Sequence, residues 1–164
     1  MSDLPPWLKH ATVWLLLAGA VFMGVQAWQA HQRSTRFVFE GDKLELRRGS
    51  DGHYHWPGRV GTREVEFLVD TGATGTALPA ELARELGLPA VGSVRSSTAG
   101  GIVTGAVVLG DLELDGGVRV QRLPMAALPN LGKPLLGMDV LGKLRWRQEQ
   151  GVLHIELPTP ARRE

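Results

Sequence analysis

The sequence contains no cysteine among its 164 residues. This absence rules out disulfide bonds, thiolate zinc sites and cysteine nucleophiles. It leaves the cellular compartment open, because proteins without cysteine also occur in oxidising compartments. Stability must therefore come from packing, with association between chains as a further source.

A large charge of one sign is also missing. Lysine and arginine together number 18, and aspartate and glutamate together number 17. The sequence thus lacks the basic excess that attracts nucleic acid over a broad surface, and we expect no nucleic-acid partner. No internal repeat is visible, and the length suits one soluble domain with a modest core.

Clusters of metal-ligating or nucleophilic side chains are scarce. His53 and His55 would share one face of a strand, but no further ligands stand beside them, which favours packing or surface histidines over a metal site. The other three histidines are dispersed, and no serine elbow would recruit one as a base. We therefore predict neither a metal nor another cofactor.

The one long apolar run lies at residues 11–28 and contains no charged residue. As a helix it would be about 27 Å long, just enough to cross a hydrocarbon core of roughly 30 Å. We expect an uncleaved transmembrane anchor within residues 1–28 and a polar tether at residues 29–36. The alternative is a cleaved signal peptide, with Val25 and Ala27 as the small residues of the cleavage site.

Residues 37–158 are predicted to form an all-β domain, followed by a polar tail at residues 159–164. Short segments carry branched or aromatic residues at alternate positions and are separated by glycine-containing turns. One short helix is predicted at residues 79–86, where a proline precedes good helix formers and Gly87 follows. A second helical turn is predicted at residues 138–143, with Asp139 near its start.

The strongest local feature is the segment from Phe67 to Thr74, in which an apolar strand runs into Asp70 and then into a tight turn of small residues. Such a turn holds a carboxylate at a fixed point. Two carboxyl groups that share one proton can hydrolyse a peptide bond, one as base toward water and the other as acid toward the carbonyl. Taken alone, however, Asp70 also fits an aspartate that bonds backbone amides at a strand end.

The residues after Asp70 would let two such loops approach each other. In this interpretation the Thr71 hydroxyl bonds backbone across the paired loops, and Gly72 and Ala73 allow close approach. Thr74 would bond the carboxylate or a bound substrate.

This segment resembles the active-site loop of the retropepsin-like aspartic proteases, particularly their bacterial single-domain, membrane-anchored branch. Downstream, Leu135, Leu136 and Gly137 resemble the family's second signature, a strand end beneath the catalytic loop that leads into a short helix. The resemblance covers residues 53–157. Between the two signatures lie the residues that correspond to the family's flap, for which a plain hairpin turn is the alternative: Thr98, Ala99, Gly100, Gly101 and Ile102.

The resemblance implies a closed β-barrel with one or two short helices and an aspartic endopeptidase that acts on peptides or proteins. Because the chain holds a single Asp-Thr-Gly, the active form would be a homodimer with Asp70 from each chain. The family closes its dimers with terminal strands, for which residues 152–157 are the candidate. The resemblance also implies a single-pass protein of the bacterial inner membrane with its protease domain in the periplasm.

Substrate identity is not readable from the sequence. The candidate substrate contacts are all apolar and indicate only an apolar preference: Leu68, Ala99, Ile102, Val103 and Leu135.

Two other functions fit parts of the pattern. A catalytically silent module would keep the groove and bind peptides at the membrane without cleaving them. A phosphorylated aspartate would also follow a strand and precede Thr-Gly, but such enzymes alternate strands with helices and need further acids for magnesium. The mainly β pattern favours the protease.

Overall fold

The computed structural model describes residues 14–26, 36–39, 43–98 and 101–157. The chain divides into two units, Met1–Ser34 and Thr35–Glu164, and each is considered by itself. In the first unit, residues 14–26 form a helix with exposed side chains. Among the described residues, no helix combines the length and apolar character needed to cross a membrane. The apolar run predicted as an anchor extends beyond the described helix at both ends.

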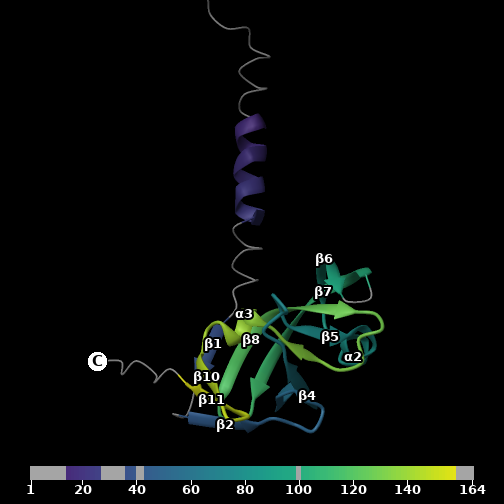
Figure 1. Cartoon of the computed structure of the whole chain (residues 1–164). Coiled ribbons are helices and arrows are strands. Elements are labelled where there is room, and N and C mark those ends of the chain that lie inside the picture. Colours follow the sequence, from purple (N-terminus) through teal and green to yellow (C-terminus); the bar gives the residue numbers. More distant parts are fainter. Residues whose placement is uncertain (1–13, 27–35, 40–42, 99–100, 158–164) are drawn as a thin grey trace, which may run out of the picture. The chain divides into compact units, whose positions relative to one another are not determined.

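The second unit is mostly β, as the sequence predicts (Figure 1). Two short helices, α2 (Ala80–Glu85) and α3 (Met138–Leu141), interrupt the strands near their predicted positions. The strands are β1 (Arg36–Phe39), β2 (Lys43–Arg47), β3 (His55–Val60), β4 (Arg63–Val69), β5 (Ala77–Pro79), β6 (Ala90–Thr98), β7 (Gly101–Leu114), β8 (Val118–Leu128), β9 (Leu135–Leu136), β10 (Arg145–Glu149) and β11 (Val152–Glu156).

The larger sheet closes on itself. Its order is β1-β8-β5-β9-β4-β3-β7-β6, and an additional pairing joins β7 to β8. The closed ring therefore contains six strands, β8-β5-β9-β4-β3-β7, while β1 and β6 lie outside it. This ring confirms the predicted closed barrel, in which alternate side chains fill the interior.

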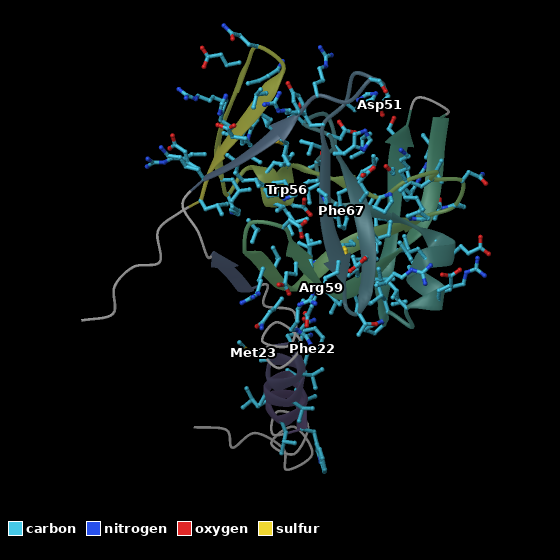
Figure 2. The ribbon with its side chains drawn as sticks, turned by 90° about the horizontal axis from the view of Figure 1, so that it is seen from below. Phe22, Met23, Asp51, Trp56, Arg59 and Phe67 are labelled. Atoms are coloured by element: carbon cyan, nitrogen blue, oxygen red, sulfur yellow. The ribbon has the colours of Figure 1, made fainter. Side chains whose placement is uncertain are left out.

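The barrel core is built from the predicted alternation. Trp56 on β3 and Phe67 on β4 lie directly opposite each other and are fully buried. Both are labelled in Figure 2. The indole N–H of Trp56 donates to the Asp115 carbonyl at 2.8 Å, so its polar atom is satisfied inside the core. Burying side chains of this size stabilises the fold by about 1.5–3 kcal/mol each.

A separate sheet, in the order β10-β11-β2, lies at the opposite end of the domain from α2 and the β6–β7 hairpin (Figure 1). This sheet corrects one prediction. The segment at residues 152–157 was expected to close a dimer, yet β11 is the central strand and pairs with β10 on one side and β2 on the other. Because both of its edges are occupied within one chain, β11 has no edge for a strand of a second chain.

Candidate active site

Asp70 lies where β4 ends, and the neighbouring strand fixes its backbone. The short strand β9 pairs in parallel with β4, so that Leu136 lies opposite Val69. The Asp70 N–H donates to the Leu136 carbonyl at 3.0 Å. Leu136 is fully buried and Leu135 half-buried. Strand β9, which contains the predicted supporting residues Leu135 and Leu136, therefore lies beside the end of β4 that leads into the active-site loop.

The loop after Asp70 turns back on the carboxylate. The Gly72 N–H donates to Asp70 Oδ1 at 2.9 Å, and the Ala73 N–H donates to the Asp70 carbonyl at 3.3 Å. Within the described residues, the Gly72 N–H is the one hydrogen-bond donor to this carboxylate, so Oδ2 is available to a ligand. The side chains of Thr71 and Thr74 are exposed, and neither bonds Asp70 in the described part of the chain.

Glycine is required where the loop meets the second signature. A Cβ built on Gly137 would lie 2.4 Å from the Gly75 carbonyl carbon, far inside van der Waals contact. This close approach lets the Met138 N–H donate to the Ala73 carbonyl at 2.9 Å and the Asp139 N–H donate to the Thr74 carbonyl at 3.1 Å. The start of α3 is thus tied to the active-site loop by two backbone hydrogen bonds.

Two polar residues that the sequence did not single out for the site complete this connection. Thr76 is only 1% exposed and is the one buried polar residue among those described. Its N–H and hydroxyl donate to the two carboxylate oxygens of Asp139, at 2.9 Å and 2.8 Å. Asp139 lies in the first turn of α3, as predicted, and accepts a further bond from the Val140 N–H at 2.9 Å. Its carboxylate therefore binds both its own helix and the loop.

A groove of about 840 Å³ opens beside Asp70. One wall is the active-site loop, and the other is the strand β6 at Val94–Ser97. Asp70 and Arg95 are the two charged residues among those that line it. The remaining lining residues are small, apolar or hydroxyl-bearing: Gly72, Ala73, Thr74, Gly75, Thr76, Ala77, Val94, Ser96, Ser97, Val107, Pro124, Met125, Ala126, Leu128, Leu131 and Leu135.

The predicted flap is a β-hairpin formed by β6 and β7, with Thr98 paired to Gly101 next to its tip. Ala99 and Gly100 lie outside the described residues. Ile102 is 68% exposed and does not line the groove. The groove is lined by the middle of β6 instead.

Most of the apolar residues expected from the sequence to contact substrate lie outside the lining of this groove. Of the described candidates, Leu135 alone lines the groove, whereas Leu68 and Val103 do not. Most of the lining residues that sequence reasoning missed come from β6 and β8. The parallel pairing with β5 brings β8 to the groove, and the β7–β8 pairing brings β6 there, because β6 pairs with β7.

The histidines expected to be structural make local contacts. His55 lies between two carboxylates, with Nε2 2.8 Å from Asp51 Oδ2 and Nδ1 2.9 Å from Glu66 Oε1. The backbone N–H of His53 and the side chain of His55 lower the pKa of Asp51. Among the described residues, no group of three or more metal-ligating side chains is assembled.

Comparison with solved structures agrees with this geometry at the level of the fold. A retropepsin-like aspartic protease from Rickettsia conorii matches with a TM-score of 0.54 and 23% sequence identity, over 75% of this chain and 93% of that chain. The barrel described above is thus a retropepsin-like fold.

The sequence comparison goes further than the fold. A family model described as "Aspartyl protease" matches residues 56–140, just over half of the chain, including the Asp70 loop and the β9–α3 segment. The chain belongs to this aspartyl protease family. A comparison with curated proteins found no match.

Proposed function

We propose that this protein is an aspartic endopeptidase, active as a homodimer, in which Asp70 of each chain supplies one of two catalytic carboxylates. The observation that carries the proposal is the position of Asp70. Its carboxylate lines a groove large enough for an extended peptide, with Oδ1 held by the Gly72 N–H and Oδ2 available. The family membership supports the same chemistry.

The proposed reaction needs two such carboxylates sharing one proton. The ionised Asp70 takes a proton from water as the water oxygen attacks the peptide carbonyl carbon, while the protonated Asp70 of the partner subunit donates to the carbonyl oxygen. When the tetrahedral intermediate breaks its C–N bond, a proton passes to the leaving amine. Each chain has one Asp-Thr-Gly, so the second carboxylate must come from a symmetry-related copy.

Replacing Asp70 by asparagine tests this assignment. Asp70→Asn removes the general base but keeps an oxygen that can accept the Gly72 N–H, so the loop and fold should survive. We expect peptide cleavage to fall below detection, with an unchanged circular dichroism spectrum. Asp115→Asn, an exposed turn residue away from the groove, is the matched control and should cleave normally. Cleavage retained by Asp70→Asn would refute the assignment.

A catalytically silent peptide-binding module is the competing function. It predicts that the unaltered protein binds extended peptides and dimerises, but cleaves none of them from acidic to neutral pH. Turnover that depends on Asp70 would exclude it.

We also propose that the N-terminal segment anchors the protease to a membrane, with the domain in the bacterial periplasm. The support is the uncharged run at residues 11–28, together with the exposure of its apolar side chains. Phe22 and Met23, labelled in Figure 2, are 64% and 72% exposed in the described helix. Resistance of the full chain to alkaline extraction, together with a C-terminal reporter active only in the periplasm, tests both parts. Release by alkali would contradict the anchor.

A further inference from the structure

Helix α2 stands beside a cavity that the active site does not use. The helix packs against β7 and β8, and a cavity of about 400 Å³ is lined by residues of all three elements. The lining includes the buried side chains of Ala83, Val108 and Ala127. Alanine and glycine supply much of the rest, so the helix and the strands leave space unfilled. A cavity of this size with mostly apolar walls is typical of small-molecule sites.

The cavity and the active-site groove lie on opposite faces of the same two strands. Ala106 pairs with Ala127, and Val107 pairs with Ala126. The first pair lines the cavity beside α2, whereas the second lines the groove beside Asp70. Successive side chains of a strand point to opposite faces, and the two hollows share none of the described lining residues. The cavity is therefore a separate site and no extension of the groove.

Arg84 on α2 is the one charged residue among the described residues that line this cavity. It is exposed, and its guanidinium group makes no hydrogen bond or ion pair within the described part of the chain. The two acidic residues of the same helix, Glu81 and Glu85, do not line the cavity. Apolar walls are thus combined with a single cation that no carboxylate of the described chain neutralises.

This combination fits a ligand with an apolar body and one negative charge. A guanidinium group binds a carboxylate through two parallel N–H donors, which suits a single charge better than a bulky polyanion. The larger apolar side chains of the lining, Leu88, Val108 and Pro129, are all aliphatic. No described lining residue is aromatic, so a ring would find nothing to stack against. An aliphatic chain matches these walls better than an aromatic ring does.

We propose that the cavity between α2 and the β7–β8 pair binds an aliphatic carboxylate. The hydrocarbon chain lies against Ala83, Val108 and Ala127, and the carboxylate lies on the Arg84 guanidinium group. The ligand would fill the gap between the helix and two strands whose other face lines the active-site groove. The proposal is independent of proteolysis at Asp70, because the two sites use different residues.

Because the chain has no cysteine, one introduced thiol can report on this cavity alone. Thr104→Cys changes little in size and places the thiol in the lining. In the full-length protein, octanoate at ten times its Kd should slow alkylation of this thiol by iodoacetamide about tenfold. Ser97→Cys, in the lining of the active-site groove, is the matched control and should react at an unchanged rate. No protection of Thr104→Cys, or equal protection of both thiols, would overturn the proposal.

Arg84→Gln tests the polar contact in the Thr104→Cys background. An exposed ion pair contributes up to roughly fivefold in affinity, so half-protection should require about fivefold more octanoate. Octanol has the same chain without the charge, and its half-protection concentration should stay the same. Arg95→Gln makes the corresponding change in the active-site groove and should leave octanoate binding unaltered. Unchanged octanoate binding by Arg84→Gln, or stronger protection by octylamine than by octanoate, would contradict the proposed contact.

The length of the ligand tests the apolar walls. From butanoate to octanoate, each added methylene that is buried should lower the half-protection concentration roughly fourfold. Equal potency of butanoate and octanoate would show that the chain does not enter the cavity. Asp70→Asn should be protected at Thr104→Cys as well as the protein with Asp70 is, so loss of the protease assignment would leave this site standing, and the reverse holds too.

Discussion

The carboxylate of Asp139 accepts two hydrogen bonds from Thr76, from its N–H at 2.9 Å and from its hydroxyl at 2.8 Å. The residues lie 63 positions apart in the sequence. The Thr76 hydroxyl in turn accepts the Gly137 N–H at 3.3 Å. One buried threonine thereby adds side-chain hydrogen bonds to the two backbone hydrogen bonds that tie the Asp70 loop to the strand end and helix beneath it.

We predict that this pair sets the position of the catalytic loop. Thr76→Val removes the hydroxyl while keeping the side-chain shape, and should lower the free energy of unfolding by about 1.5–3 kcal/mol, as for other hydrogen bonds to charged groups. Asp139→Ala should cost at least as much, because it leaves the Thr76 N–H and hydroxyl unpaired. Denaturant unfolding measures both losses.

The double variant distinguishes coupling from two independent defects. If the two side chains act through each other, Thr76→Val combined with Asp139→Ala should lose clearly less than the sum of the single losses. The activity of Thr76→Val, measured where it is fully folded, should fall by up to about 100-fold, since small misplacements of catalytic groups carry large rate penalties. Additive losses with normal kcat would show that the pair has no positioning role.

Gly137 should tolerate no side chain. Gly137→Ala would place its Cβ against the Gly75 backbone, so the β9–α3 junction and the loop must separate. We expect a loss of about 1–3 kcal/mol or more, together with loss of cleavage. Gly132→Ala is the control, because nothing lies within 4 Å of its added Cβ. A Gly137→Ala protein as stable and active as the control would contradict the close approach.

Arg95 should bias the substrate choice of the proposed protease. It is the basic residue among those lining the groove, and no hydrogen bond or ion pair engages its side chain in the described part of the chain. Peptides with an acidic residue near the scissile bond should have a higher kcat/KM than matched peptides with lysine there. Arg95→Glu should reverse the order, and an unchanged ratio would show that this side chain does not reach the substrate.

Glu113 should make a pH-dependent contribution to stability. It lies directly opposite Arg59 on β3 and Arg119 on β8, and hydrogen bonds from Arg59 and then Arg119 lower its pKa below the ordinary value of 4.5. A carboxyl group with a lowered pKa in the folded state stabilises the protein above its unfolded pKa, and this stabilisation disappears as the pH falls through the folded value.

The matching experiment compares Tm across pH. Glu113→Gln should melt at a lower temperature than the unaltered protein at pH 7, and the difference should vanish as the pH falls well below 4.5. Glu85 is an exposed glutamate whose side chain makes no hydrogen bond or ion pair among the described residues, so Glu85→Gln should show little difference at either pH. A difference for Glu113→Gln that persists in acid would point to a cause other than the charge.

Local sequence was sufficient to predict the strands and helices and to identify Asp70 as the candidate catalytic residue. Alternating apolar residues such as Trp56, Val60 and Phe67 predicted strands here, and the structure buries these three side chains in β3 and β4. The helix at residues 80–85 begins directly after Pro79. It ends before Gly87, because the positive φ of Gly87 (+60°) is incompatible with a right-handed helix. Asp70 could also be identified from local sequence, because an apolar strand that ends in an acidic residue and a turn of small residues is a pattern of neighbouring residues.

Only the tertiary structure decided what meets Asp70 and which edges are open. The hydrogen bonds between Thr76 and Asp139 exist because β4 and β9 pair in parallel, and no local propensity specifies a contact across 63 residues. The lining of the groove by β8 and β6 likewise depends on the pairing of β8 with β5 and of β7 with β8. Residues 152–157 carried the correct strand pattern, but whether a strand is central or at an edge depends on where the remaining strands pack. The sequence by itself thus determined the elements and one carboxylate, and long-range pairing decided the site around it.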